Sequence, residues 1–160
     1  MIQRSLAVAA LALMLLSSIG GLVHAFSTGH ETLLRLREHH EPAFTQAARG
    51  RTEASQTELE HAIRQNFGHV RVIDAHTHVI KLASLALMLS FIVPLLPLTD
   101  RGRRMLAVTF LAGTLLFPGG VLAQVWMPGV VFQGVAAIGA VLVIAALVTT
   151  VYGLFTLRQE

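Results

Sequence analysis

The sequence predicts an all-α protein, a bundle of four transmembrane helices that forms a single membrane domain over residues 1–160. Three observations predict this class. Hydrophobic residues make up 54% of the chain and charged residues only 13%, about half the charged share of a typical soluble domain. The mean hydropathy is +0.65. The apolar residues fall into four stretches, each with roughly the 20 residues that a helix needs to cross the hydrocarbon core.

The predicted spans cover residues 6–26, 79–98, 105–126 and 130–155. None of them contains Asp, Glu or Arg, and Lys81 stands at the start of the second span, where its side chain can reach the membrane surface. The first span also fits a signal peptide that would be cleaved before Phe26. Its apolar stretch is long for such a peptide, so we expect the span to be retained.

The arginines predict the orientation of the bundle, because positively charged loops stay cytoplasmic. A four-span topology places five arginines on one side: Arg4, Arg101, Arg103, Arg104 and Arg158. We therefore expect a multi-pass protein of a bacterial inner membrane with both termini in the cytoplasm. The excess of arginine on this inner rim explains the high pI of about 10.6 better than nucleic-acid binding does.

Residues 27–75, between the first two spans, are expected to form an extracytoplasmic helical hairpin that turns at residues 49–52. Pro42 predicts a kink or a break in the first helix of the hairpin. Ser55 and Glu58 match a capping box at the start of the second helix. That helix is expected to continue directly into the second span.

All eight histidines lie between His24 and His78, and the chain has no cysteine. Imidazole is therefore the main ligand available for a transition metal or for haem iron. If the hairpin folds at residues 50–51 with equal rise on both sides, His24 stands level with His76 and His78. The same register places His30 opposite His69, and His39 and His40 opposite His61.

The tier at the membrane surface is the first candidate site. His24 with His76, or His24 with His78, is a candidate axial pair for haem b held between two helices, or a site for copper or zinc. The alternative is that these histidines only occupy the headgroup region, as other amphipathic side chains do.

The second candidate site binds a divalent metal through His39, His40 and His61, with neighbouring glutamates orienting the imidazoles. The alternative is a solvated, mixed-charge helix surface. His30 and His69 are expected to be structural.

Polar residues inside the spans are few. Gln124 and Gln133 flank the outer turn between the last two spans and could approach the histidines or pair helices. Pro118, followed by two glycines, predicts a break in the third span. Small residues predict close packing of the last two helices, namely Gly113, Gly134, Ala136, Gly139 and Ala140.

The residue pattern also excludes several functional classes. A proton- or sodium-coupled transporter is not expected, because no acidic residue lies in a span. No polar stripe predicts a pore. No nucleophile–base pair or carboxylate pair predicts an enzyme.

The stretch from Asp74 to Leu89, which opens with His76-Thr77-His78, resembles the H-x-H-opened helices of small bacterial haem-associated four-helix membrane proteins. It also resembles some helices of proteins like subunit I of the haem–copper oxidases. The Gly/Pro pattern from Leu111 to Gly120 resembles the third helix of the same proteins. Ala83-Ser84 stands where these families usually have glycine. The resemblance covers about half of the chain and implies His76 or His78 as a haem ligand.

Together these features predict a small, non-enzymatic membrane protein that binds haem or a transition metal through outer-face histidines, as an accessory subunit of a redox complex. The alternative is a ligand-free assembly subunit. In that case the hairpin would dock a membrane or periplasmic protein through the apolar stripe formed by Leu59, Ile63, Phe67 and Val70. The lipid bilayer is a partner in both cases, and no nucleic acid is expected.

Overall fold

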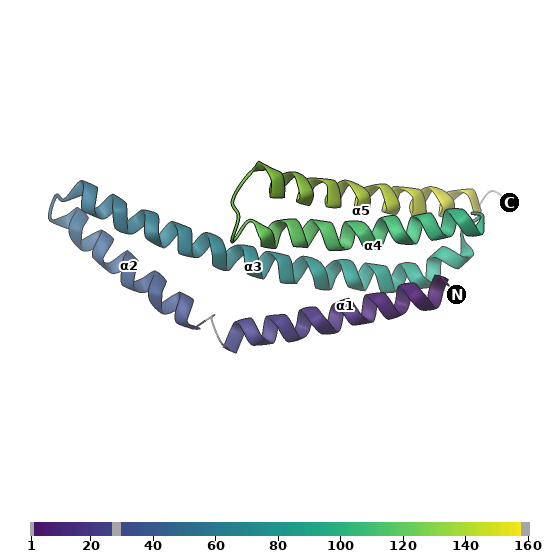
Figure 1. The fold of residues 1–160 in the computed structure, drawn as a ribbon, viewed down its shortest axis with the longest axis horizontal. Coiled ribbons are helices and arrows are strands. Elements are labelled where there is room, and N and C mark those ends of the chain that lie inside the picture. The colour runs from purple at the N-terminus through teal and green to yellow at the C-terminus, as the bar shows by residue number, and fades with distance from the viewer. Residues whose placement is uncertain (1, 27–29, 158–160) are drawn as a thin grey trace.

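The structure, a computed structural model, describes residues 2–26 and 30–157. Within these residues the chain is helical apart from short connections, and it contains no strand. The helices are α1 (Ile2–His24), α2 (His30–Ala48), α3 (Thr52–Ile92), α4 (Asp100–Ala123) and α5 (Val130–Leu157), with a short 3₁₀ helix, η2 (Val93–Leu95), after α3 (Figure 1). The predicted all-α class is confirmed.

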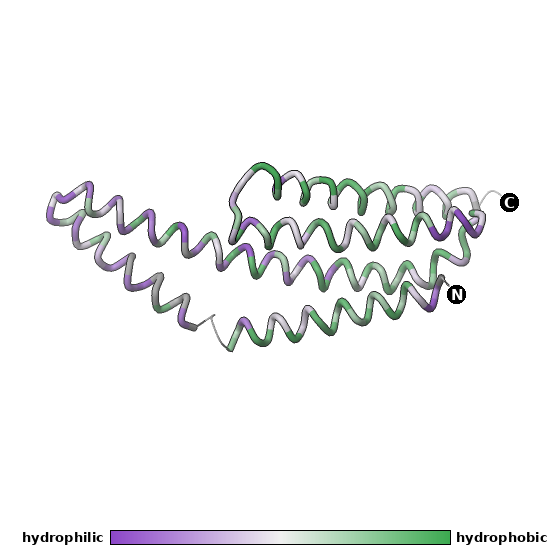
Figure 2. Tube along the Cα trace, in the orientation of Figure 1, coloured by the Kyte–Doolittle hydropathy of each residue, from purple (hydrophilic) through white to green (hydrophobic). Residues whose placement is uncertain are grey.

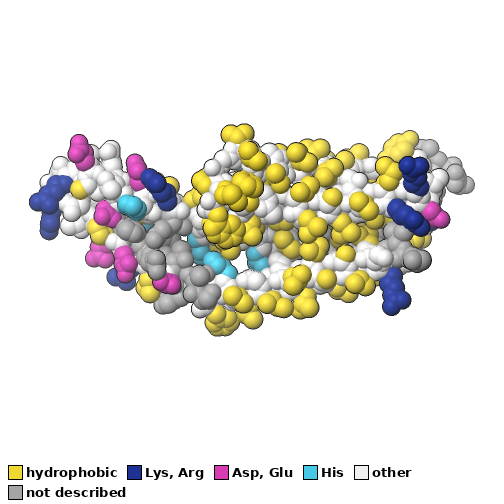
Figure 3. Space-filling model, in the orientation of Figure 1, with side chains coloured by type: hydrophobic (Ala, Val, Ile, Leu, Met, Phe, Trp, Pro, Cys, Tyr) yellow, Lys and Arg dark blue, Asp and Glu magenta, His cyan; other side chains and the backbone are white. Residues whose placement is uncertain are grey.

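Among the described residues, four helical stretches are long and apolar enough to cross a membrane: α1, α3 continued by η2, α4 and α5. The four predicted spans are confirmed to this extent. The hydropathy colours of Figure 2 change along α3, from mixed and polar beside α2 to mostly apolar toward its end at η2. Apolar side chains are spread over the visible surface of the bundle in Figure 3. On α5, for example, the side chains of Ile144 and Val148 are 60% and 62% exposed.

α3 is a single helix of 41 residues, so the predicted continuation of the hairpin helix into the second span is confirmed. It begins at Thr52, after a turn in which Gly50 takes a φ of +70°, a conformation that residues with a Cβ rarely adopt. The predicted capping box is wrong, because this early start places Ser55 inside the helix. The Ser55 hydroxyl instead donates a hydrogen bond of 2.9 Å to the carbonyl of Ala43 in α2.

Neither proline inside a long helix interrupts it. α2 continues through Pro42, and α4 continues through Pro118 from Asp100 to Ala123. The predicted break in the third span is therefore wrong, and α2 is not divided in two. Pro118 is buried in α4, which packs against α3 and α5, and such packing holds a helix together across one missing hydrogen bond.

α4 lies between α3 and α5, and its contact with α5 is very close (Figure 1). A Cβ added to Gly120 would lie 2.6 Å from the backbone nitrogen of Ala136, and one added to Gly139 would lie 2.7 Å from the Cα of Phe117. The predicted small-residue packing is confirmed at Gly139 and Ala136. A Cβ on Gly134 would meet nothing within 4 Å.

The main core lies toward the end of the bundle that holds the N terminus. Its largest fully buried side chains include Leu6, Leu96 and Phe110, from α1, the segment after η2, and α4. Toward the other end, α1 packs on α3 but has little contact with α4. The two helices therefore leave space between them at that end.

The register of the N-terminal helices against α3 differs from the predicted one. Ser17 of α1 contacts His76, and Ala43 of α2 contacts Ser55. The chain thus uses 26 positions from 17 to 43 where α3 uses only 21 positions from 55 to 76. The predicted register assumed that the chain rises equally on the two sides of the hairpin. At Ser17 the observed position along α3 differs from the predicted one by about two helical turns.

Candidate functional site

The candidate site is a cavity of about 830 Å³ between α1, α3 and α4. Aliphatic residues form most of its wall, among them Leu13, Leu16 and Val72. The polar groups come from Ser17, Thr114 and three histidines: His24, His69 and His76. Its volume is within the range of about 300 to 1,000 Å³ that is usual for cofactor and small-molecule sites. Imidazole atoms are visible in a hollow of the surface in Figure 3.

His24 and His69 form a pair at the outer end of this cavity. Their ring centres are 5.6 Å apart and their planes are inclined by 34°. Both side chains are partly buried, and Nδ1 of His69 is buried without a hydrogen-bond partner among the described residues. His24 is the last residue of α1, so the pair stands where that candidate span ends.

His76 lies two turns further along α3, about 10 Å deeper than His69 if the rise is that of an ordinary helix. Its Nδ1 is 3.0 Å from the hydroxyl oxygen of Ser17. A Cβ on Gly21 would lie 2.6 Å from Nε2 of the same ring, so the ring occupies the space that this glycine leaves open.

His78 lies elsewhere. Its ring packs on Phe117 of α4 with the centres 4.6 Å apart, and it does not line the cavity. His76 and His78 diverge because positions i and i+2 of a helix point about 160° apart. Of the predicted axial pairs, the structure therefore brings His24 and His76 to one cavity and places His78 against another helix.

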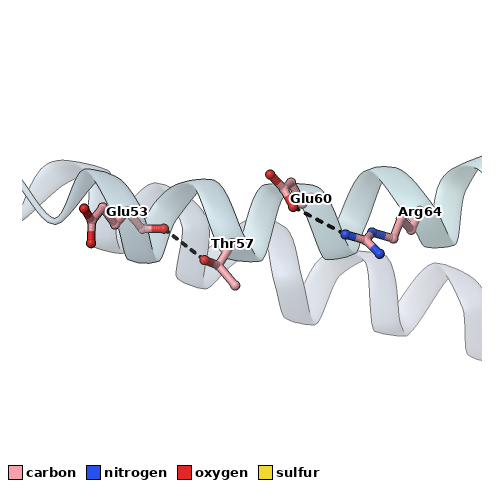
Figure 4. A network of polar contacts seen from close by, with 4 residues as sticks. All are labelled: Glu53, Thr57, Glu60 and Arg64. Carbon is pink, nitrogen blue, oxygen red and sulfur yellow. Dashed lines mark hydrogen bonds and ion pairs between the residues drawn. The ribbon is translucent and has the colours of Figure 1, made fainter.

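The second predicted site shows no comparable arrangement. His40 and His61 are exposed, and the imidazoles of His39 and His30 lie outside the described part of the structure. Near His61, the carboxylate of Glu60 lies 3.4 Å from the guanidinium of Arg64 on the exposed surface of α3 (Figure 4). The described residues contain no group of three or more His, Asp or Glu that could hold a metal ion.

Gln124, also considered from the sequence, has a structural role. Its side-chain amide is buried and donates a 3.1 Å hydrogen bond to the carbonyl of Gly120 within α4. Gln133 is exposed on α5. Neither residue lines the cavity.

Sequence reasoning missed His69, Ser17 and Gly21 as parts of the site. His69 and His76 are seven residues apart, which places them on one face of α3. Ser17, Gly21 and His24 follow one another at spacings of four and three, which places them on one face of α1. A search for facing polar and small positions on the two helices could have found this set.

Three imidazoles from two helices line this largely apolar cavity, two at its outer end and one deeper. They can bind a metal centre that brings part of its own ligand set, or can hydrogen-bond a polar edge of a lipophilic molecule. The chain matches no protein-family model, and no curated protein or solved structure matches it.

Proposed function

We propose that this protein is a multi-pass membrane protein whose four spans are α1, the second half of α3 with η2, α4 and α5. The apolar surfaces of these helices support the proposal, because water would meet them only at a high cost. In this arrangement α2 and the first half of α3 form a helical hairpin outside the membrane.

The same proposal places both termini in the cytoplasm of a bacterium, with the chain in the inner membrane. Arginines support this orientation: Arg4 lies in the first turns of α1, and Arg101, Arg103 and Arg104 lie in the first turns of α4. Positive charge of this kind is retained on the cytoplasmic side. The cavity histidines then lie at the outer membrane surface and just below it.

The function that the geometry supports best is the binding of haem b in the cavity between α1, α3 and α4. The observation that carries it is the presence of three imidazoles in an otherwise largely apolar cavity of about 830 Å³. Haem iron takes four nitrogens from the porphyrin and needs one or two protein ligands, whereas a closed zinc site takes four protein ligands. A few imidazoles therefore suit haem better than a bare zinc or copper ion.

The three histidines have different proposed roles. His76 is the first-choice iron ligand, because it lines the cavity and lies deeper in it than the outer end of α1. His24 is the second ligand. His69, in contact with His24 at the outer end, is suited to hydrogen-bond a polar edge of the macrocycle. We propose that a protein holding haem in this way serves as a non-enzymatic accessory subunit of a redox complex.

Optical and elemental analysis of the full-length protein tests this function. The chain is expressed with ample haem, purified in detergent, and measured for a Soret band and for iron, copper and zinc. We expect about one haem per chain in the wild type, and little or none in a His24→Ala/His76→Ala double variant that is still folded. A wild-type protein without haem under these conditions would overturn the proposal, and stoichiometric copper or zinc would reassign the ligand.

A second candidate function, subunit assembly, rests on a different observation. The apolar stripe of Leu59, Ile63, Phe67 and Val70 on α3 is 43–58% exposed, since α2 packs on another face of the helix. Such a stripe is suited to an apolar helix of a membrane or periplasmic protein. Ile63→Asp should abolish cross-linking to that partner, whereas Thr57→Asp, which adds the same charge on an exposed site of α3, should not. Equal cross-linking of both variants and the wild type would exclude the stripe.

A further inference from the structure

Ser17 makes two contacts with His76, across the interface between α1 and α3. Its hydroxyl oxygen is 3.0 Å from Nδ1 of the ring and 3.3 Å from the backbone carbonyl oxygen of the same residue. A serine hydroxyl has one proton to donate and two lone pairs to accept with. The carbonyl oxygen can only accept.

Only one placement of protons satisfies both contacts. If the Ser17 proton points to the carbonyl, the hydroxyl oxygen must accept at the ring, so Nδ1 carries the imidazole proton. If the Ser17 proton points to Nδ1 instead, the hydroxyl and the carbonyl oxygen face each other with no proton between them. The neutral ring then has its lone pair on Nε2 in the first case and on Nδ1 in the second.

Gly21 fixes the position of the same ring. A Cβ at this residue would lie 2.6 Å from Nε2 and 2.8 Å from Nδ1 of His76, so any larger residue must displace the imidazole. The neighbouring Gly20 has nothing within 4 Å of its own Cβ position, although both glycines line the cavity. Gly21 therefore leaves the space that the ring occupies, and Ser17, one turn earlier in α1, forms the hydrogen bond to the ring.

We propose that Ser17 and Gly21 are positioning residues that preset His76 with its proton on Nδ1 and its lone pair on Nε2, ready to bind a Lewis-acidic centre in the cavity. The identity of that centre as haem iron rests on the proposed function. The preset ring is a property of the protein without any ligand. Ligating histidines commonly donate their second ring N–H to a fixed acceptor, and the Ser17 hydroxyl is that acceptor here.

Nitrogen NMR of the ligand-free, full-length protein tests the preset ring directly. The protein carries ¹⁵N in its histidine rings, is held in detergent at about pH 8.5, where ordinary histidine is neutral, and His76 is assigned by its loss in His76→Gln. We expect the Nδ1–H form in the wild type and in Ser17→Thr, which keeps the hydroxyl. Ser17→Ala should shift the ring toward the Nε2–H form. A wild-type ring mainly in the Nε2–H form, or a ring that Ser17→Ala leaves unchanged, would overturn the proposal.

A haem titration adds a matched pair of variants. Gly21→Ala should weaken binding by about tenfold or more, the usual cost of disturbing the groups that orient a metal ligand. Gly134→Ala, on α5 and outside the cavity lining, adds a methyl group that meets nothing within 4 Å and should leave binding within about twofold. Equal affinities for the two variants would refute the role of Gly21. Absence of haem binding in the wild type would refute the proposed function, while the NMR result still decides the preset ring by itself.

Discussion

Glycine serves two different purposes at two of the helix interfaces of the bundle. Between α4 and α5, Gly120 and Gly139 admit the backbone of the opposite helix. Between α1 and α3, Gly21 admits the imidazole of His76. The first contact closes the interface. The second seats a polar ring beside a cavity, at the end of the bundle where α1 and α4 have little contact. The missing Cβ therefore lets two backbones meet at one interface and makes room for an imidazole ring at the other.

Gly139→Ala should have the largest effect on stability, because backbone atoms of Phe117 lie where the new methyl group must go. Backbone cannot rotate away as a side chain can, so the two helices must separate. We expect a loss of about 3 kcal/mol, the upper part of the range for overpacking, measured by reversible unfolding in mixed micelles. Gly134→Ala on the same helix is the control, and a similar loss there would contradict the close contact at Gly139.

Gly21→Ala should destabilise the protein less, by about 1 to 2 kcal/mol. The new methyl group meets ring atoms of His76, and a side chain can move at a lower cost than a backbone. The same unfolding measurement compares it with Gly139→Ala. If Gly21→Ala were the more damaging substitution, the distinction between a closed interface and an adaptable one would fail.

His78→Ala should cost about 1 kcal/mol, the value of a ring pair of this kind, because it removes the contact with Phe117. Haem affinity should stay within about twofold of the wild type, because His78 neither lines the cavity nor orients an iron ligand. Loss of a group that orients a ligand would weaken binding tenfold or more. A combined measurement of unfolding and haem titration checks both values. Loss of haem binding would place His78 in the site.

The smallest effect is expected outside the bundle, in the polar contacts of α3 shown in Figure 4. The side chains of Glu60 and Arg64 are 68% and 79% exposed, so solvent screens their ion pair. Glu60→Gln should change the free energy of unfolding by less than about 0.5 kcal/mol. A change several times larger would show that this surface is not simply solvated.

The sequence predicted the helices far better than their register. Apolar runs and turn residues suffice for the all-α class, the four apolar helices and the continuous α3, because these depend on local composition. The break predicted at Pro118 was wrong because the packing of neighbouring helices, which the local sequence does not contain, maintains a helix through proline. At Pro42, where a kink or a break was predicted, α2 is not divided.

The candidate site was predicted in part for the same reason. His24 and His76 were singled out from their place at the membrane surface, but their neighbours depend on the register of α1 against α3, which the local sequence does not contain. The observed register places His69 beside His24 and Ser17 beside His76. The sequence left His76 and His78 as alternative partners of His24. In the structure the two rings diverge, as positions i and i+2 of a helix do, so that His78 packs on Phe117 and does not line the cavity.

The most direct test of the account compares haem affinity in His76→Ala and His78→Ala. These imidazoles are two residues apart on one helix, at nearly the same depth, and only His76 lines the cavity. We predict that His76→Ala lowers affinity by at least about tenfold and changes the Soret band, while His78→Ala changes neither. Equal affinities and spectra in the two variants, or a loss confined to His78→Ala, would contradict the claim that the cavity between α1, α3 and α4 is the binding site.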